Sequence, residues 1–103
     1  MLVYVAHPYG GEERNKKDVE NIIKCWTKTH DKNVIFISPI HAFGYMYNDF
    51  SYEVGMDMCL ELLRKCDYLI VCKGWEKSRG CNMEVDCAKE NGANFRAKIA
   101  GAR

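Results

Sequence analysis

The stretch DYLIVCKGWEKSRGCNMEVDCAKENG, residues 67–92, contains a strand, a turn and a helix in that order. Residues 67–72 are predicted as a strand, because residues 68–72 form a continuous apolar run of the kind that is typical of a strand buried on both faces. Residues 80–91 carry apolar side chains at helical spacing, and Gly92 is a typical helix stop. The stretch therefore predicts a strand followed by a helix, which is the repeating element of a parallel α/β sheet.

The same strand–helix unit occurs twice more, earlier in the chain. The strands are predicted at residues 2–6 and 33–38, and the helices at residues 12–29 and 51–66. This alternation favours one parallel sheet covered by helices, in a single domain spanning residues 1–103. After Gly92 the run is too weakly apolar to predict a fourth strand, so residues 93–103 are expected to form a weakly defined tail.

The composition argues against several classes of partner. Lys and Arg total 15 and Asp and Glu total 14, for a formal net charge of +1. No basic excess is therefore present to bind nucleic acid. No apolar run approaches the roughly 20 residues of a membrane span, and the N-terminus lacks the basic flank of a signal peptide. We expect a cytoplasmic protein that binds neither nucleic acid nor membranes.

The six cysteines include no Cys-x-x-Cys pair, and most lie inside apolar stretches. The chain has three histidines and no zinc-ligand spacing, so we predict no metal site. Small apolar cysteines of this kind are typical of reduced packing residues in a cytoplasmic protein.

Three segments, residues 7–11, 39–50 and 73–80, follow the predicted strands, and open parallel sheets bind ligands at the carboxyl ends of their strands. The first segment, HPYGG, is either an anion-binding loop or a plain tight turn, since paired glycines let backbone N–H groups approach an anion. Neither a Walker A loop nor a Gly-x-Gly-x-x-Gly motif is present, and we predict no cofactor.

Glu84 is the one charged residue on the apolar side of the predicted helix 80–91, whose stripe contains Cys81, Val85 and Ala88. A carboxylate that faces a core is costly unless it is hydrogen-bonded or functional. Tyr4, in the middle of the first predicted strand, has a hydroxyl that needs a partner when buried. Two interpretations stay open for Glu84: a structural carboxylate tied to the backbone or to a tyrosine, and a functional one.

The segment between residues 39 and 52 contains five aromatic residues, which is more than a solvent-exposed loop needs. They could stack a base, form a lid or line a dimer interface. His41 and Phe43 are candidate ligand contacts, although a lone loop histidine is more often not a ligand. A homodimer or larger homo-oligomer is expected, because a chain this short buries a limited share of its own surface.

These motifs together resemble the nucleoside 2-deoxyribosyltransferase superfamily, which includes deoxynucleoside monophosphate N-glycosidases. The resemblance rests on YVAHPYGG at residues 4–11, CDYLIV at residues 66–71 and a Ser-x-Gly-x-x-x-Glu pattern at residues 78–84. It implies a doubly wound three-layer α/β sandwich with a small, mainly parallel sheet of flavodoxin-like or Rossmann-like type. It also implies an active site that a neighbouring subunit commonly completes.

The resemblance implies roles for particular residues. Glu84 matches the carboxylate nucleophile that attacks the anomeric carbon of a 2-deoxyribonucleoside, and Tyr4 matches the tyrosine that holds it. Ser78 and Gly80 match positions that contact the 5′-phosphate in the nucleotide hydrolases. The loop that would wrap the sugar and the phosphate consists of His7, Pro8, Tyr9, Gly10 and Gly11.

The sequence departs from the family pattern in two places. A second acid should protonate the departing base, but the aspartate of the family falls at Cys59. Asp57 is the nearest carboxylate and our candidate for the acid, with Asp49 as the alternative, although Asp57 is predicted on the polar face of its helix. The weak run after Gly92 is the second departure, because it removes the last strand of the fold.

We therefore expect cleavage of the N-glycosidic bond of a (deoxy)nucleoside 5′-monophosphate or nucleoside, by hydrolysis or by deoxyribosyl transfer. Arg79 and Arg14 favour a phosphorylated substrate, held by residues 7–11 and 78–80 side by side at the edge of the sheet. The alternative is a protein that binds or sequesters a nucleotide without turnover, which the missing second carboxylate supports. A structural dimer without a ligand leaves Glu84 unexplained.

Overall fold

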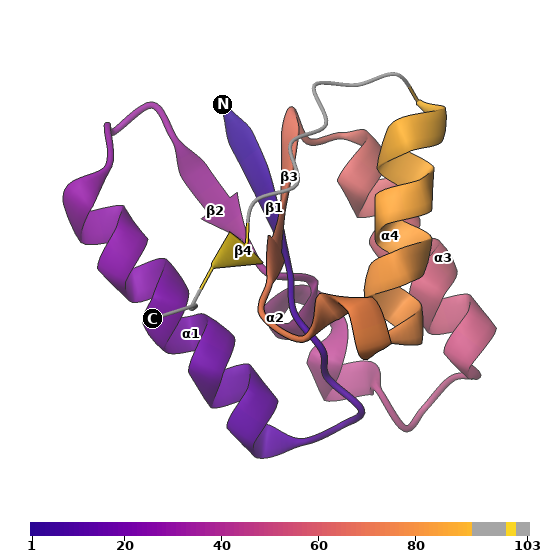
Figure 1. Cartoon of the computed structure of the whole chain (residues 1–103). Helices are drawn as coiled ribbons and strands as arrows, with labels where there is room; N and C mark the ends of the chain where they lie inside the picture. Colours follow the sequence, from indigo (N-terminus) through magenta and orange to yellow (C-terminus); the bar gives the residue numbers. More distant parts are fainter. Residues whose placement is uncertain (92–98, 101–103) are drawn as a thin grey trace.

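Four parallel strands form one sheet in the computed structural model, which describes residues 1–91 and 99–100 (Figure 1). The strands are β1 (Leu2–Ala6), β2 (Ile35–Ile37), β3 (Tyr68–Cys72) and β4 (Ile99–Ala100), in the spatial order β2-β1-β3-β4. In the centre of the sheet, Tyr4 of β1 is in register with Ile37 of β2 and with Leu69 of β3. The parallel α/β sheet predicted from the sequence is confirmed.

Within the described residues, four α-helices and two short 3₁₀ turns accompany the strands. They are α1 (Glu13–Thr29), α2 (Pro39–Phe43), η1 (Gly44–Met46), α3 (Tyr52–Arg64), η2 (Trp75–Lys77) and α4 (Arg79–Glu90). Three of the helices begin after a serine whose side-chain oxygen accepts a backbone N–H, namely Ser38 before α2, Ser51 before α3 and Ser78 before α4. Such caps satisfy backbone donors that a helix leaves unpaired at its start, so these serines fix where the three helices begin.

Side chains that alternate along the strands build two cores, one on each face of the sheet. Tyr4 of β1 belongs to the core that contains Leu63 of α3 and Val85 of α4, whereas Val5 packs in the core that contains Val19 of α1. Figure 1 shows α1 on one side of the sheet and α3 and α4 on the other. Both faces are covered, which explains why the strands are almost continuously apolar.

The expectation of a loop directly after the second strand is wrong for residues 39–43, which form the helix α2. Pro39 occupies the first turn of this helix, where its missing N–H costs nothing, and the Ser38 hydroxyl accepts the N–H of His41. The helix places Ile40 and Phe43 beyond the carboxyl ends of the strands, where both line a pocket.

The expectation that the last strand is missing is also wrong. Ile99 and Ala100 form β4 and pair in parallel with Val71 and Cys72 of β3. Pairing at a sheet edge uses backbone N–H and C=O groups, so a weakly apolar run does not prevent it. The other residues of the expected tail, 93–98 and 101–103, lie outside the described residues.

No helix in the part of the chain that the structure describes combines the length and the apolar character needed to cross a membrane. All six cysteines lie in that part, and none is in a disulfide. The four buried ones are Cys66, Cys72, Cys81 and Cys87. Their burial agrees with the predicted packing role.

Candidate functional site

A pocket of about 390 Å³ opens at the carboxyl ends of β1 and β3. The segments after both strands contribute lining residues, among them His7 and Ser78. The helices α3 and α4 contribute others, among them Cys59 and Glu84. The segments after β1 and β3 meet here because the two strands are hydrogen-bonded neighbours. The expectation that these two segments share one site therefore agrees with the structure.

Glu84 lies at the floor of the pocket and is only 5% exposed. It sits on the apolar side of α4, beside the buried Cys81, Val85 and Ala88, as the helical spacing predicts. The Tyr4 hydroxyl donates a hydrogen bond to the Glu84 carboxylate across the core between β1 and α4. Tyr4 itself is fully buried and does not line the pocket, so it holds Glu84 from behind.

Burial changes the acidity of both partners in this pair. Burial raises the pKa of Glu84 to about 7, against the opposing effect of the Tyr4 hydrogen bond, which lowers it. Burial, and then the charge of Glu84, hold the pKa of the Tyr4 hydroxyl well above its usual value. Tyr4 therefore stays a hydrogen-bond donor, while Glu84 changes its charge near neutral pH.

Cys59 of α3 lines the pocket and interacts with both Tyr4 and Glu84. Burial raises the pKa of its thiol to about 11, with a further increase from the charge of Glu84, and a hydrogen bond with the Tyr4 hydroxyl opposes the shift. The sequence analysis identified position 59 only as the place of a missing aspartate. The structure brings this thiol next to Glu84 and Tyr4, where it stays protonated at neutral pH.

His7 lines the pocket with a ring that is held by two internal contacts. Its Nε2 lies 2.6 Å from Asp18 of α1, and its Nδ1 lies 2.7 Å from the carbonyl oxygen of Pro8. The side chain of His7 is 5% exposed, whereas that of Asp18 is 62% exposed. His7 therefore fixes the end of β1 against α1 and has no free ring nitrogen for a ligand.

The loop after His7 contributes only Tyr9 to the pocket lining. Pro8, Gly10 and Gly11 do not line it, although all three are candidate substrate contacts in the sequence analysis. Gly10 and Gly11 have φ values of 60° and 74°, the left-handed region that glycine adopts without strain, and they lead the chain into α1. Tyr9 does line the pocket, and its ring packs edge-on against that of Tyr47 at 5.0 Å between centroids.

The walls of the pocket are mostly apolar and aromatic. Phe43, a candidate ligand contact, lines it, and so do further residues that the sequence analysis did not assign individually, namely Met46, Tyr47, Phe50, Tyr52, Met56 and Met58. Met56 could have been found from its position, because it lies one helical turn before Cys59 on α3. Flat rings fit such walls by stacking, since aromatic pairs prefer offset or edge-on contact.

Ser78 and Gly80, at the start of α4, both line the pocket. The Ser78 side-chain oxygen accepts the N–H of Cys81 at 3.2 Å, so Ser78 caps the start of α4. A Cβ on Gly80 would lie 3.0 Å from the Tyr52 hydroxyl oxygen and 3.3 Å from the Met56 sulfur. Glycine at this position therefore lets α3 and the Tyr52 ring approach the beginning of α4 closely.

The arginines expected to bind a phosphate do not line the pocket. The Arg79 guanidinium lies over the Tyr52 ring, 4.7 Å from its centroid, and 3.9 Å from Glu53. Arg14 pairs with Glu12 at 3.0 Å, and its side chain is 84% exposed. Both point to solvent because each sits on the polar side of its helix, where a long charged side chain remains hydrated.

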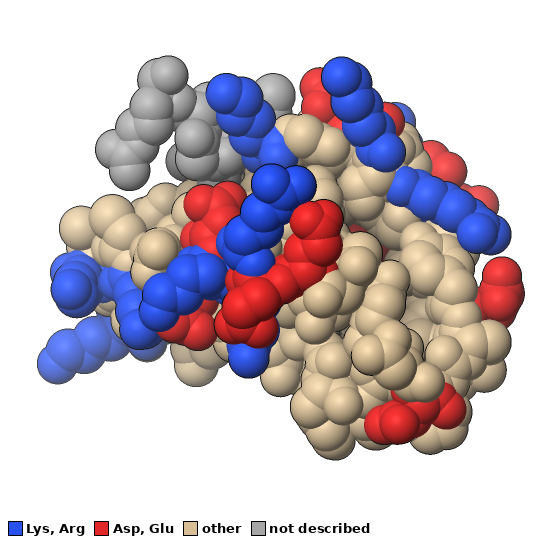
Figure 2. All heavy atoms as spheres, turned by 90° about the horizontal axis from the view of Figure 1, so that it is seen from below, with Lys and Arg blue, Asp and Glu red and all other residues tan. Residues whose placement is uncertain are grey.

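Apart from Glu84, charged side chains lie beside the pocket and not within its described walls. Figure 2 views the molecule from the carboxyl ends of the strands, and in it charges of both signs gather over α1, while the lower part of the opposite half is mostly uncharged. Among the described residues that line the pocket, Glu84 is the only Asp or Glu, and Lys and Arg are absent. A ligand would therefore meet one titratable carboxylate in apolar surroundings.

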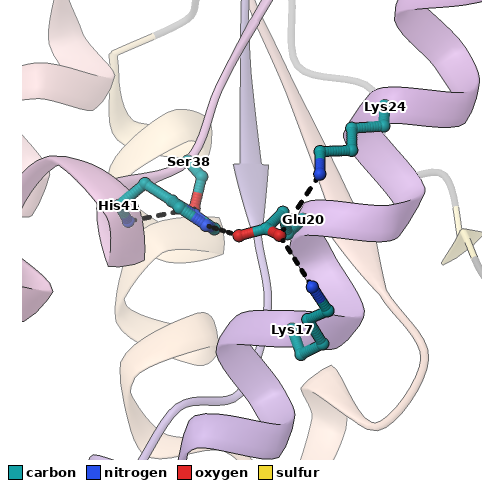
Figure 3. A network of polar contacts seen from close by, with 5 residues as sticks. All are labelled: Lys17, Glu20, Lys24, Ser38 and His41. Carbon is teal, nitrogen blue, oxygen red and sulfur yellow. Dashed lines mark hydrogen bonds and ion pairs between the residues drawn. The ribbon is translucent and has the colours of Figure 1, made fainter.

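His41 is not in the pocket and belongs to a separate network on the other face of the sheet (Figure 3). Its Nδ1 lies 2.9 Å from the Ser38 hydroxyl and its Nε2 lies 3.3 Å from Glu20, which Lys17 and Lys24 also contact. The hydrogen bond from His41, and then the Lys17 side chain, lower the pKa of Glu20 to about 2. The network ties α2 to α1, so the prediction of His41 as a ligand contact is not supported.

Asp57, the candidate for the second acid, is exposed on α3 and does not line the pocket. Its neighbours in sequence, Met56 and Met58, do line it, and a helix turns the side chain between them outward. Asp49, the alternative, is also exposed and outside the lining. The structure therefore brings neither carboxylate to Glu84.

Residues 1–98 of the chain match the family model described as "Domain of unknown function (DUF7768)". None of the curated proteins compared with the chain matches it.

Proposed function

The chain belongs to this family of unknown function, and we propose from its pocket that it cleaves the N-glycosidic bond of a (deoxy)nucleoside or its 5′-monophosphate, with Glu84 as nucleophile. The observation that carries the proposal is the position of Glu84. It is a buried carboxylate that a tyrosine holds from behind, at the floor of a pocket with aromatic walls. A carboxylate in this setting can stabilise the positive charge that develops on a sugar.

The flavodoxin-like type that we propose for the fold supports a ligand site in the pocket. The strand order β2-β1-β3-β4 is the beginning of the flavodoxin-like order, in which helices cover both faces of a doubly wound sheet. In such sheets the order in which strands are added reverses between β1 and β3, which remain parallel, and ligands bind outside the carboxyl ends of these strands. The pocket lies at that crevice.

The proposed reaction proceeds in two displacements at the anomeric carbon. An ionised Glu84 oxygen attacks this carbon, a C–O bond forms, and the C–N bond breaks with its electron pair leaving on the base. Water or another base then attacks the same carbon, and the Glu84 carboxylate is released. Tyr4 acts as a positioning residue, because its hydroxyl fixes one carboxylate oxygen and leaves the other available.

The phosphate of a nucleotide substrate would lie at the start of α4. Backbone N–H groups at a helix N-terminus attract anions, and the Ser78 hydroxyl can donate a further hydrogen bond. Since the described lining contains no Lys or Arg, this contact depends on dipoles and not on a full positive charge. Nucleoside and nucleotide therefore both remain substrates to be tested.

A second candidate function is binding of the same ligands without turnover. It is favoured by one observation, namely that Glu84 is the only carboxylate in the described lining of the pocket. Base release normally uses a second acid. A protein that only sequesters a nucleotide would need the shape of the pocket but not that acid.

We also propose that the protein acts in the cytoplasm as a homodimer or larger homo-oligomer. Tyr45 is 80% exposed and Phe50 is 51% exposed, close to the aromatic residues at the mouth of the pocket. Exposed aromatic side chains in such a group favour association with another protein surface. Six thiols without a disulfide suit a reducing compartment.

The experiment that tests the function is a search for free base. The protein is incubated with a panel of deoxynucleosides, nucleosides and their 5′-monophosphates, and the released base is measured by chromatography. We expect release from at least one member and its loss in Glu84→Gln. Glu90→Gln is the matched control, because Glu90 is exposed on the same helix. Release by Glu84→Gln at the wild-type rate contradicts the assignment, and ligand binding without any release favours the second candidate function.

A further inference from the structure

The pocket offers few groups that can give a proton to a departing base. Glu84 is the only Asp or Glu in its described lining, and Glu84 must be ionised to attack the sugar. Asp57 and Asp49 are exposed outside it. A carboxylic acid close enough to the leaving group is therefore missing from the described residues of the pocket.

The other groups with protons are poor substitutes for such an acid. His7 has both ring nitrogens engaged, one by Asp18 and one by the Pro8 carbonyl. Burial keeps the pKa of the Cys59 thiol at about 11, and the pKa of the Tyr52 hydroxyl also lies above its usual value because of burial. A hydroxyl or thiol of this kind donates a hydrogen bond, but it transfers a proton reluctantly at neutral pH.

This shortage has a consequence for the reaction. When Glu84 attacks, the electron pair of the C–N bond moves to the leaving group. A leaving group that receives no proton from the protein departs as an anion, or as a neutral molecule if it was already cationic in the substrate. Either way, the rate depends on how stable the departing group is by itself.

We propose, on the basis of the function proposed above, that the site selects substrates by the acidity of their leaving group and that Cys59 is the residue that sets this selection. Cys59 lines the pocket on α3, where the Tyr4 hydroxyl that binds Glu84 is also its hydrogen-bond partner and the charge of Glu84 acts on it. A carboxyl group at position 59 would lie beside Glu84, and two neighbouring carboxyls hold one proton between them. The thiol cannot supply that shared proton, so the substrates are deoxyribosides whose base is a stabilised anion or carries its own positive charge.

The test uses aryl deoxyribosides whose leaving groups differ in acidity and little in shape. The para-nitrophenyl, para-chlorophenyl and phenyl compounds are assayed with the wild-type protein and with Cys59→Asp. A general acid typically contributes roughly 10²–10⁴-fold. In the wild type we therefore expect kcat/KM to fall by about 10²-fold or more from the nitrophenyl to the phenyl compound. In Cys59→Asp we expect most of this decrease in kcat/KM to disappear, because the new carboxyl group protonates the leaving group and the phenyl compound reacts faster.

The matched control is Cys59→Asn, which has nearly the same shape as Cys59→Asp and has no acidic proton. It should keep the steep dependence on the leaving group. Thermal unfolding of both variants checks that they are folded. If Cys59→Asp does not fold, the wild-type series still decides, because a flat dependence in the wild type means that another group supplies the proton.

The outcomes separate this inference from the proposed function. Cleavage of all three compounds at similar rates by the wild type, lost in Glu84→Gln, overturns the inference and leaves the function standing. Equal flattening in Cys59→Asp and Cys59→Asn also overturns it, because the effect is then one of shape. No cleavage of any compound, together with no base release from nucleosides or nucleotides, refutes the proposed function itself.

Discussion

The Tyr4 hydroxyl donates a hydrogen bond to Glu84, which lies 80 positions later in the chain. The strand β1 supplies one partner and the helix α4 the other, and both side chains are buried. A buried carboxylate without a partner would be costly, so this bond helps to explain how Glu84 is tolerated inside the apolar stripe of α4. It also leaves the carboxylate facing the pocket, where its charge can act on a ligand.

The rate of base release should rise with pH through about 7, because the raised pKa of Glu84 leaves the nucleophile protonated at lower pH. The measurement is kcat/KM for base release across the pH range. A profile that is already flat between about pH 5 and about pH 8 contradicts a role for Glu84 as an ionised nucleophile.

The stability of the fold should show the opposite dependence on pH. The pKa of Glu84 is raised from 4.5 to about 7 on folding, so its contribution is fully present below 4.5 and is lost as the pH rises through 7. Urea unfolding measures this as the difference in unfolding free energy between the wild type and Glu84→Gln. That difference should fall by about 3 kcal/mol between about pH 4 and about pH 8, and a constant difference would show that burial does not shift this carboxyl.

Tyr4→Phe removes the hydroxyl and keeps the ring in the core. We expect a loss of about 1–3 kcal/mol in unfolding free energy, because Glu84 loses its hydrogen-bond donor. The pKa of Glu84 should rise further, since the Tyr4 hydrogen bond lowers it, and the pH profile of base release should move to higher pH. A structural role alone would change the stability without moving the profile, so the position of the profile decides.

Ser78→Ala removes a cap and a candidate phosphate contact. We expect about 1 kcal/mol of destabilisation from the lost cap, together with a smaller preference for a 5′-monophosphate over the matching nucleoside in a binding titration. Ser38→Ala is the control, because Ser38 caps α2 and does not line the pocket. Equal affinity of the wild type for nucleotide and nucleoside would contradict a phosphate site at the start of α4.

Replacing both Tyr45 and Phe50 by serine should shift the protein towards monomers. The two side chains are 80% and 51% exposed. Their replacement removes apolar area from the proposed interface between copies. Sedimentation at micromolar concentration measures the change. Ile35→Ser is the control, because Ile35 is 55% exposed on β2, which lies at one edge of the sheet. A monomeric wild-type protein would count against the assembly.

Several features of the site follow from short-range patterns. The spacing of apolar residues predicts which side of α4 faces the core, and Glu84 is buried on that side. The alternation of strands and helices predicts a parallel sheet, and its carboxyl edge is where the pocket opens. The polar face of α3 predicts that Asp57 points outward. Periodicity carries this information because each element is buried on a defined side.

Other features depend on contacts between elements that are distant in sequence. Nothing local to Cys59 indicates that α3 brings its thiol to Glu84 and Tyr4. Likewise, the sequence around His41 does not reveal that Glu20 of α1 binds its ring. The same holds for Arg79, which is close to the site in sequence but lies over the ring of Tyr52 and outside the pocket lining.

The sequence by itself therefore determined the strands β1, β2 and β3, the helices α1, α3 and α4, their buried sides and the one carboxylate among apolar residues. Only the tertiary structure decided which of the candidate residues line the pocket. The physical reason is that helix and strand periods fix the direction of a side chain relative to its own element. The distance between side chains on α3, α4 and β1 depends on how these elements pack, and close approaches such as that of Tyr52 to Gly80 set that packing.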